Sequence, residues 1–304
     1  MMQMKTLTKF FPGAKAAAVD ALNLEVNDGE IVGFAGLNGA GKTTTIRICA
    51  GIIFPTSGTA EIDGHNIVSE KRKASCNIGW VPEFPNFEPN AKPVSLLNYY
   101  GRFYDINKKD LEDRIETLLK ATGLSEHTEK RLKNYSQGMK KRFSLASALL
   151  SDPRNMLLDE TLNGLDPEGV RYVKSLIMSM KKEGRAIFLS SHILSELENV
   201  ADRIAIIKSG KVVSIVSRNE LSHLGSRQTI RLSVVNPDSK LITLLQSYGE
   251  VSSEGNDFSV TNVRVDAEKA HLVNNELARA GYVVSRFTVA GENFEDYFFR
   301  LVGQ

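Results

Sequence analysis

The fold is decided by the stretch Gly36-Leu37-Asn38-Gly39-Ala40-Gly41-Lys42-Thr43, which matches the phosphate-binding loop pattern G-x-x-x-x-G-K-[ST]. The apolar run Ile31–Ala35 before it predicts a strand that is buried on both faces. Glycines allow the sharp turn, and bare backbone N–H groups can then wrap a phosphate chain. A helix that opens at about Lys42 directs its positive end at the same charge. The Lys42 ammonium can face the outer phosphates, and the Thr43 hydroxyl can hold Mg²⁺.

The spacing of the glycines excludes the dinucleotide-binding fingerprint of Rossmann folds. That fingerprint reads G-x-G-x-x-G, whereas Gly36, Gly39 and Gly41 give G-x-x-G-x-G followed by Lys-Thr. A glycine-rich turn with a chance Lys-Thr is the alternative interpretation. Further motifs along the chain argue against this alternative.

The composition is that of an ordinary globular chain, long enough at 304 residues for two domains. Its formal net charge of +2 gives no strong basic field for nucleic acid. Cys49 and Cys76 are too few for a disulfide framework, so reduced cytosolic thiols are expected. No apolar run approaches the length of a membrane span, and the first residues lead to no signal-peptide core. We therefore expect at most a peripheral association with a membrane.

From about residue 87 the hydrophobic pattern changes to helical spacing. Leucines and aromatic residues recur every three or four positions, which predicts a helical insert at about 87–151 within an α/β domain. Ser136 is a candidate N-cap for the last helix of this insert. The alternative for this stretch is a normally capped helix in which the basic run Lys140-Lys141-Arg142 is a solvated turn.

Paired carboxylates follow another apolar run, at 155–158. Asp159 and Glu160 would stand at a buried strand end, where a carboxylate is costly without a cation. Mg²⁺ would satisfy Asp159, and Glu160 could polarise an attacking water; a charge pair at the start of the next helix is the alternative. His192 follows the buried strand predicted at 186–191, at the carboxyl edge where open α/β sheets carry their functional residues.

Five motifs in this order, over about residues 5–217, resemble the ATP-binding cassette (ABC) family, specifically the ATPase subunits of transporters. They are the P-loop, Ser136-x-Gly138, Asp159-Glu160, Gly164-Leu165-Asp166 and Ser190-Ser191-His192. The resemblance implies an α/β fold with a P-loop NTPase core. That core would have a mostly parallel sheet, an N-terminal antiparallel β subdomain and a helical subdomain. The resemblance also implies ATP and Mg²⁺ as cofactors, and ATP hydrolysis coupled to transport.

The resemblance further implies roles for single residues. Glu160 would be the catalytic carboxylate, and Lys42 and His192 would contact the phosphates. The implied nucleotide-binding residues are Phe11, Val19, Gly36, Leu37, Asn38, Gly39, Ala40, Gly41, Lys42, Thr43, Thr44, Ser136, Gln137 and Gly138. The implied ligands of Mg²⁺ are Thr43, Glu83 and Asp159. Phe11 would stack on adenine, although from the residues alone ordinary packing is as good an interpretation.

The implied partners are a second copy and a separate integral-membrane permease, with no nucleic acid. Ser136 and Gly138 would cap the ATP held by the second, head-to-tail copy. The expected location is the cytoplasm, peripheral on the inner face of the cell membrane. Tyr135-Ser136-Gln137-Gly138-Met139 departs from the usual L-S-G-G-Q in a way that resembles ABC-2 type exporters with separately encoded permeases.

Two further departures from the family pattern concern the metal site and a loop. Glu83 stands where the family usually has a glutamine that touches Mg²⁺ and senses the membrane partner. A glutamate can still bind the metal but adds a negative charge, which leaves the sensing role open. Thr161-Leu162 replaces the usual Pro-Thr and affects loop geometry more than chemistry.

The tail resembles the accessory domain of the same exporter branch. Its predicted order of strand, helix, strand, strand, helix, strand suggests a small ferredoxin-like α+β domain. These elements are expected at 229–235, 239–248, 250–254, 258–263, 267–280 and 282–289, with a final helix at 293–302. We therefore expect two domains, the ABC ATPase at 1–217 and the accessory domain at 218–304.

Two other functions stay open at this stage. One is a non-transport cassette that acts on nucleic acid or ribosomes. The single cassette, the near-neutral charge and the lack of a long charged coiled-coil pattern speak against it. The other is a regulatory module that holds ATP without turnover. The presence of Lys42, Asp159, Glu160 and His192 speaks against that function.

Overall fold

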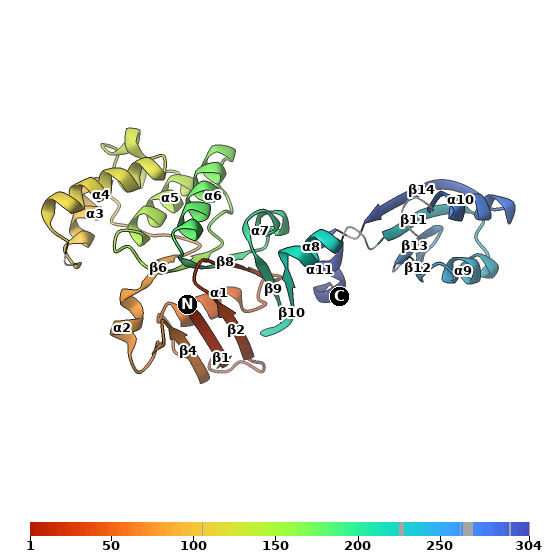
Figure 1. Ribbon diagram of the computed structural model, residues 1–304, viewed down its shortest axis with the longest axis horizontal. Helices are drawn as coiled ribbons and strands as arrows, with labels where there is room; N and C mark the ends of the chain where they lie inside the picture. Colours follow the sequence, from red (N-terminus) through yellow and green to blue (C-terminus); the bar gives the residue numbers. More distant parts are fainter. Residues whose placement is uncertain (105, 225–227, 262, 264–269, 292, 304) are drawn as a thin grey trace. The chain divides into compact units, whose positions relative to one another are not determined.

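The computed structural model describes residues 1–104, 106–224, 228–261, 263, 270–291 and 293–303 (Figure 1). The chain divides into two compact units, Met1–Val216 and Ser217–Gln304. No helix in the described ranges is long and apolar enough to cross a membrane.

A six-stranded sheet forms the centre of the described part of the first unit, with the strand order β10-β9-β3-β8-β7-β6. The strands are β3 (Ile31–Ala35), β6 (Ile78–Val81), β7 (Asn155–Asp159), β8 (Ala186–Ser191), β9 (Arg203–Lys208) and β10 (Lys211–Ser217). The pairs β3–β8, β3–β9, β7–β8 and β6–β7 are parallel, so the carboxyl ends of these five strands meet at one edge. Every residue of β3, β7 and β8 is buried, as the apolar runs predict.

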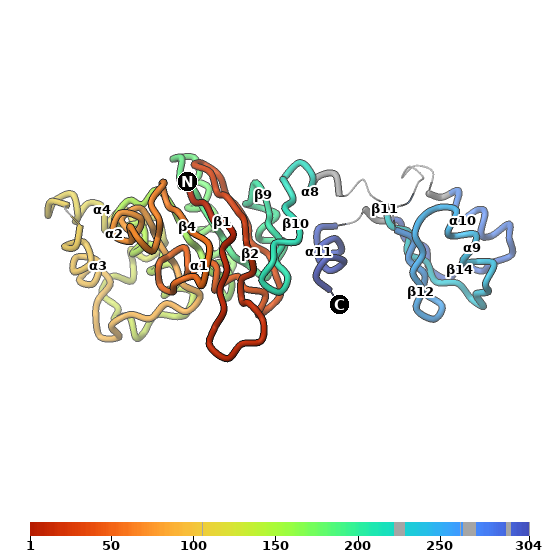
Figure 2. Tube along the Cα trace, turned by 90° about the horizontal axis from the view of Figure 1, so that it is seen from below, coloured from red at the N-terminus to blue at the C-terminus, as the bar shows by residue number. Residues whose placement is uncertain are grey.

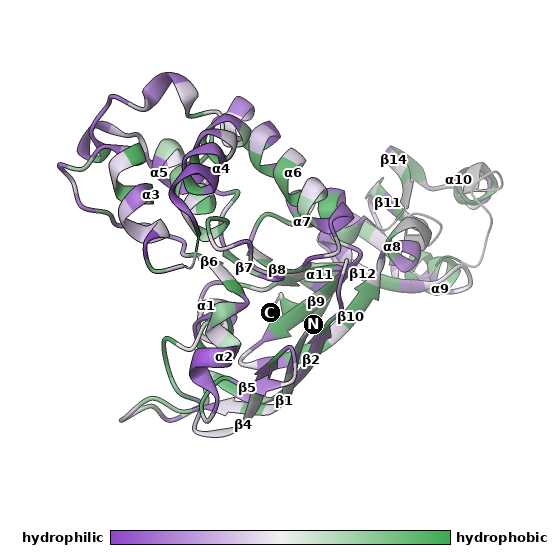
Figure 3. Cartoon of the chain, turned by 60° about the vertical axis from the view of Figure 1, so that its left-hand side comes forward, coloured by the Kyte–Doolittle hydropathy of each residue, from purple (hydrophilic) through white to green (hydrophobic). Residues whose placement is uncertain are grey.

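Helices cover both faces of this sheet (Figures 1 and 3). The helices α6 (Pro167–Lys182) and α7 (Leu194–Val200) lie on one face, and α1 (Lys42–Cys49) lies on the other. On the side of α1 an antiparallel sheet follows, with the order β2-β1-β4-β5. Its strands are β1 (Met2–Lys9), β2 (Val19–Val26), β4 (Ser57–Ile62) and β5 (His65–Asn66). One hydrophobic core, which includes Phe34, Ile46 and Leu22, joins the two sheets through α1.

Two elements of the first unit leave little signal in the sequence. Strand β1 runs beside β2 (Figure 2), but bulges interrupt its pairing between Met4 and Leu7 and between Leu7 and Lys9. Its alternation of buried and exposed residues is therefore broken. The short helix α2 (Lys71–Cys76) is hydrophilic (Figure 3) and buries only Ala74, so it lacks an apolar face.

The helical insert contains α3 (Pro93–Gly101), α4 (Lys108–Ala121) and α5 (Gln137–Ala148), with short 3₁₀ turns at Ser125–His127 and Leu132–Asn134. The predicted leucine and aromatic stripes form its core. Phe143 of α5 packs edge-to-face against Phe87, with ring centroids 4.8 Å apart. The predicted helical subdomain is present.

The second unit contains a four-stranded antiparallel sheet with the order β12-β13-β11-β14. Its elements are β11 (Gln228–Val235), α9 (Ser239–Gln246), β12 (Glu250–Glu254), β13 (Asp257–Thr261), α10 (Ala270–Arg279) and β14 (Val283–Gly291). This is the predicted ferredoxin-like order of elements. Ile230, Val260, Leu245 and Leu277 share one core, so both helices pack against the sheet. The predicted start of the second helix, at 267–269, lies outside the described residues.

Two further helices belong to the same unit. The final helix α11 (Phe294–Val302) was predicted, and it packs against α8 (Arg218–Leu224). The sequence analysis did not predict α8, which follows β10 directly and is only seven residues long.

Candidate functional site

The P-loop connects β3 to α1, and its glycines are required by close contacts. A Cβ atom on Gly36 would lie 2.7 Å from Ile207 Cγ2. A Cβ atom on Gly41, whose φ is +113°, would lie 2.3 Å from the backbone oxygen of Ala18. Gly41 is also the N-cap of α1, and no described side chain caps this helix. The first N–H groups of α1 are thus suited to bind an anion.

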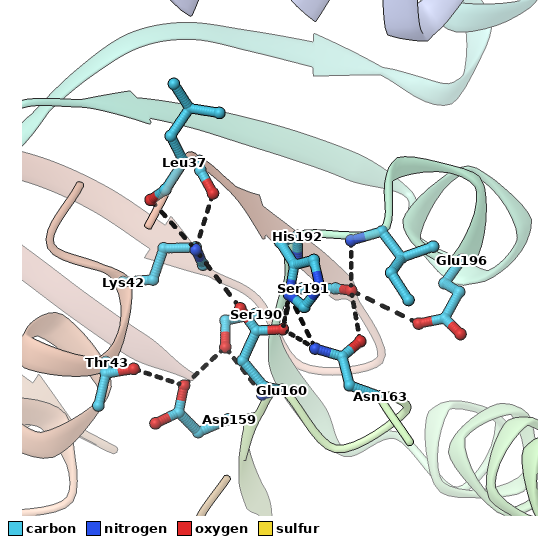
Figure 4. A network of polar contacts seen from close by, with 12 residues as sticks. Leu37, Lys42, Thr43, Asp159, Glu160, Asn163, Ser190, Ser191, His192 and Glu196 are labelled. Atoms are coloured by element: carbon cyan, nitrogen blue, oxygen red, sulfur yellow. Dashed lines mark hydrogen bonds and ion pairs between the residues drawn. The ribbon is translucent and has the colours of Figure 1, made fainter. Parts of the chain in front are cut away.

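Lys42 is the first residue of α1, and its side chain is only 6% exposed. Its ammonium group donates to the backbone oxygens of Gly36 at 2.7 Å and Leu37 at 3.4 Å (Figure 4). It also lies 3.4 Å from Glu160 Oε1. Lys42 of the P-loop and Glu160, which follows β7 in the sequence, therefore share one site.

Asp159 ends β7 and is bound from two neighbouring elements. Thr43 Oγ1 donates to Asp159 Oδ1 at 3.2 Å, and Ser190 Oγ of β8 donates to the same oxygen at 2.8 Å (Figure 4). Burial raises the pKa of Asp159, although these two hydrogen bonds act against the rise. This carboxylate is thus a buried oxygen donor next to the P-loop hydroxyl.

Glu160 has a left-handed backbone, with φ +48°, and is only 4% exposed. Its N–H group lies 3.0 Å from Ser190 Oγ and 3.2 Å from Ser190 O. Its Oε2 atom accepts from His192 N at 3.2 Å and lies 2.9 Å from His192 Nδ1; Asn163 Nδ2 contacts the same oxygen. The His192 side chain is about half exposed. Glu160 is therefore held on several sides while His192 faces the open part of the site.

Glu83 follows β6 and lies near enough to Asp159 and Glu160 for their charges to affect it. Burial raises the pKa of Glu83, and the negative charges of Asp159 and Glu160 raise it further. Lys141 and Lys42 act in the opposite direction. The site therefore concentrates negative charge between two lysines.

One cavity of about 390 Å³ brings these groups together. Its lining is formed by Ala18, Asn38, Gly39, Gly41, Lys42, Thr43, Thr44, Glu83, Glu160 and His192. Most of the P-loop and phosphate-contacting residues implied by the sequence thus face one space. That space lies at the carboxyl edge of the central sheet, where ligands of open α/β sheets bind.

Two of the implied nucleotide-binding residues, Phe11 and Val19, are not among those that line this cavity. Phe11 is 42% exposed, and the Lys9 ammonium lies 5.3 Å from its ring centroid. Val19 begins β2, and its side chain is fully buried. Its neighbour Ala18, which the sequence analysis missed, lines the cavity instead.

Ser136 begins the last helix of the insert as predicted. It is the N-cap of α5, and its Oγ accepts from Met139 N at 3.2 Å. Ser136 and Gln137 are exposed, and Gly138 is buried near Leu165. Among the described residues that line the cavity of this chain, none comes from α5.

The alternative of a solvated basic turn at Lys140-Lys141-Arg142 does not hold for Lys141 and Arg142. Lys141 is only 7% exposed, and its ammonium donates to the backbone oxygens of Glu160 and Asn163, each at 2.7 Å. Arg142 donates to the backbone oxygens of Thr122 and Gly123. Lys141 lies one turn before the buried Leu145 on the same helix face, and this spacing was the available sign of its burial.

Comparisons with known proteins agree with the motifs. Residues 19–163 match the family model of the ABC transporter. The chain is 36% identical over 304 residues to the bacitracin transport ATP-binding protein BcrA of Bacillus licheniformis, covering 98% of this chain and 95% of that protein. It is 31% identical over 221 residues to the Nod factor export ATP-binding protein I of Cupriavidus metallidurans, covering 73% and 72%.

A solved structure has the same fold as the first unit. It is a dimeric ATP-binding cassette in a post-hydrolysis state with ADP and Pi, and its TM-score is 0.66 at 22% identity. The match covers 72% of this chain and 99% of that one. From the match to the family model and the full-length relative, we conclude that this chain belongs to the ABC transporter family, as an ATP-binding ATPase subunit.

Proposed function

We propose that the chain hydrolyses Mg·ATP to drive a separate integral-membrane permease in an export system. The observation that carries the proposal is the meeting of Lys42, Asp159 and Glu160 at one edge of a parallel sheet. The relatives support the transport role, since one is named for bacitracin transport and another for Nod factor export. The substrate would be selected by the permease.

The oxygen donors of the site fit Mg²⁺. Mg²⁺ takes one or two carboxylates together with waters and substrate phosphates, and it rarely occupies an all-protein cage. In the described residues no cluster of three His, Cys, Asp or Glu side chains is arranged as a metal cage. Thr43, Asp159 and Glu83 would hold the ion, which would neutralise phosphate charge. Glu160 would polarise the attacking water, and His192 would contact the γ-phosphate.

A head-to-tail dimer would complete the site. Ser136 is exposed at the N-terminus of α5 and lies outside the cavity of its own chain, so it is free to serve a second copy. A capped helix N-terminus is a suitable clamp for a γ-phosphate. The dimeric state of the solved cassette supports this arrangement. Residues 1–217 would form the ATPase domain, and residues 218–304 an accessory domain.

The permease would be met at the cytoplasmic face of the cell membrane. Exposed aromatic side chains mark protein interaction sites when they gather. Phe84, next to Glu83, is 76% exposed, and Phe103 on the helical insert is 72% exposed. Phe103 also packs against the exposed Tyr99, with ring centroids 5.4 Å apart. These three side chains are our candidates for the contact.

Phosphate release by the full chain with Mg·ATP tests the proposal. We expect multiple turnovers in the wild type and a strong loss in Glu160→Gln, while ATP binding is retained in both. ATP binding without phosphate release would favour the regulatory module. Salt-sensitive binding of RNA or DNA would favour the non-transport cassette.

A further inference from the structure

Lys141 is a buried cation, and its ammonium group binds the backbone of Glu160, the candidate catalytic residue. It lies on α5, five residues after the N-cap Ser136. A lysine ammonium has three donors, and two of them are used by the backbone oxygens of Glu160 and Asn163 at 2.7 Å each. These oxygens belong to one turn, since Asn163 N also donates to Glu160 O at 3.3 Å. Lys141 thus holds both ends of the turn that follows β7.

Glu160 needs such contacts because its backbone is in an unfavourable region. A left-handed φ at a residue other than glycine persists only when the surrounding structure fixes it. Ser190 of β8 fixes the N–H side of Glu160, and Lys141 fixes its carbonyl side. Without Lys141 the buried carbonyl of Glu160 and the half-buried carbonyl of Asn163 would lose their ammonium donor.

The charges around Lys141 favour the same arrangement. Burial lowers the pKa of Lys141, and the carboxylates of Glu83, Glu160 and Asp159 act against this fall. The negative charges of these carboxylates therefore favour the charged form of Lys141. It also offsets the additional charge that Glu83 brings at the position where the family usually has glutamine.

We propose that Lys141 is a positioning residue for ATP hydrolysis, which orients the Glu160 carboxylate by holding the backbone of its turn. The proposal rests on the proposed function, in which Glu160 polarises the attacking water. Lys141 also connects two functional parts of the same chain. The helix whose N-cap would bind the ATP of a second copy is bonded, through Lys141, to the base that acts on its own ATP.

The first experiment compares Lys141→Met with Lys141→Gln in the full chain. Met is apolar and of similar length, so it removes both hydrogen bonds; Gln keeps two N–H donors without the charge. We expect Lys141→Met to lower kcat by about 10- to 100-fold, the scale of a misplaced catalytic group, while the Kd for Mg·ATP stays within about twofold. Lys141→Gln should recover a large part of kcat. The matched control is Lys109→Met on the exposed start of α4, which should behave as wild type.

The second experiment repeats Lys141→Met in a Glu160→Gln background, with single-turnover phosphate release as the readout. Because Lys141 acts through Glu160, we expect little additional loss there. A full additional loss, a Kd that rises in parallel with the fall in kcat, or a wild-type kcat in both Lys141 variants would overturn the proposal. If Lys141→Met does not fold, which its thermal melting curve would reveal, Lys141→Ala carries the same comparison, because it also removes both hydrogen bonds. ATP binding without phosphate release by the wild type would remove the proposed function, whereas wild-type turnover in Glu160→Gln would remove only the role of Glu160 on which this proposal rests.

Discussion

Strands β3 and β7 are alike in length and burial, but the chain leaves them in different ways. After β3 the backbone itself is the functional group, and glycines keep it close to Ala18 and Ile207. After β7 a side chain is the functional group, so the left-handed position is occupied by Glu160. The residues that allow the first turn, its glycines, lie within the turn itself. The second is held by residues that lie far away along the chain, Ser190 and Lys141.

This difference predicts how substitutions at the two strand ends will behave. At the end of β3 the loss of one group should abolish binding, since the P-loop forms the phosphate cradle. At the end of β7 the loss of one group should spare binding and affect turnover.

Lys42→Ala should remove both ATP binding and turnover. The ammonium is the full positive charge at the P-loop, and loss of one preorganised donor costs about 100- to 1000-fold in rate. Nucleotide binding by equilibrium dialysis and phosphate release would be measured on the same sample. Full ATPase activity in this variant would exclude the P-loop as the phosphate site.

Glu160→Gln should spare binding and slow the chemistry. Gln keeps the shape of the side chain and its contacts with His192 N, but it cannot polarise water as a base. We expect turnover at least ~100-fold slower, the scale of general-base catalysis, with ATP affinity near wild type. An ATP-stabilised dimer should then appear on a sizing column. Turnover at the wild-type rate would show that another group is the base.

Gly41→Ala and Gly39→Ala form a matched pair within the P-loop. Both glycines have positive φ, so either substitution costs about 1–2 kcal/mol of unfolding free energy from the left-handed backbone. A Cβ on Gly41 would also meet the Ala18 oxygen at 2.3 Å, whereas no described atom lies within 4 Å of a Cβ on Gly39. Gly41→Ala should therefore lose roughly 1–3 kcal/mol more.

Urea unfolding of the two variants, without nucleotide, provides the measurement. Equal losses in both variants would mean that backbone conformation alone requires these glycines. The contact with Ala18 would then have no energetic role.

The sequence was informative where the cause of a structure is local. Ser136 was found as an N-cap because capping depends on one side chain and the next turn. The buried strands β3, β7 and β8 were found because each is a continuous apolar run. The order of elements in the second unit was found because each helix buries one apolar face.

The sequence was uninformative where distant residues determine the outcome. Nothing near position 141 indicates that the turn 160–163 will supply two carbonyls to Lys141. That Ala18 lines the cavity and Val19 does not depends on the phase of β2. The pairing of β2 with β1 contains bulges. A shift of one residue in a strand moves a side chain to the other face, so the local pattern could not decide which of the two faces the cavity.

Glu83 stands at a third strand end, that of β6, and offers the smallest and most specific test. Its pKa is raised above the ordinary 4.5 by burial and by Asp159 and Glu160, so the folded state binds this proton more tightly than the unfolded chain does. Stability from this group is therefore fully present below the ordinary pKa and is lost as the pH rises through the interval up to the raised value. Glu83→Gln cannot titrate and should lack this loss.

The measurement is the Tm of the wild type minus that of Glu83→Gln, without Mg²⁺ and nucleotide, from about pH 4 to about pH 8. We expect this difference to fall as the pH rises. Glu116→Gln, on the exposed face of α4, is the matched control. A difference that rises with pH would mean that Lys141 and Lys42 dominate the field at Glu83. The end of β6 would then resemble the cationic end of β3 and not the carboxylate end of β7.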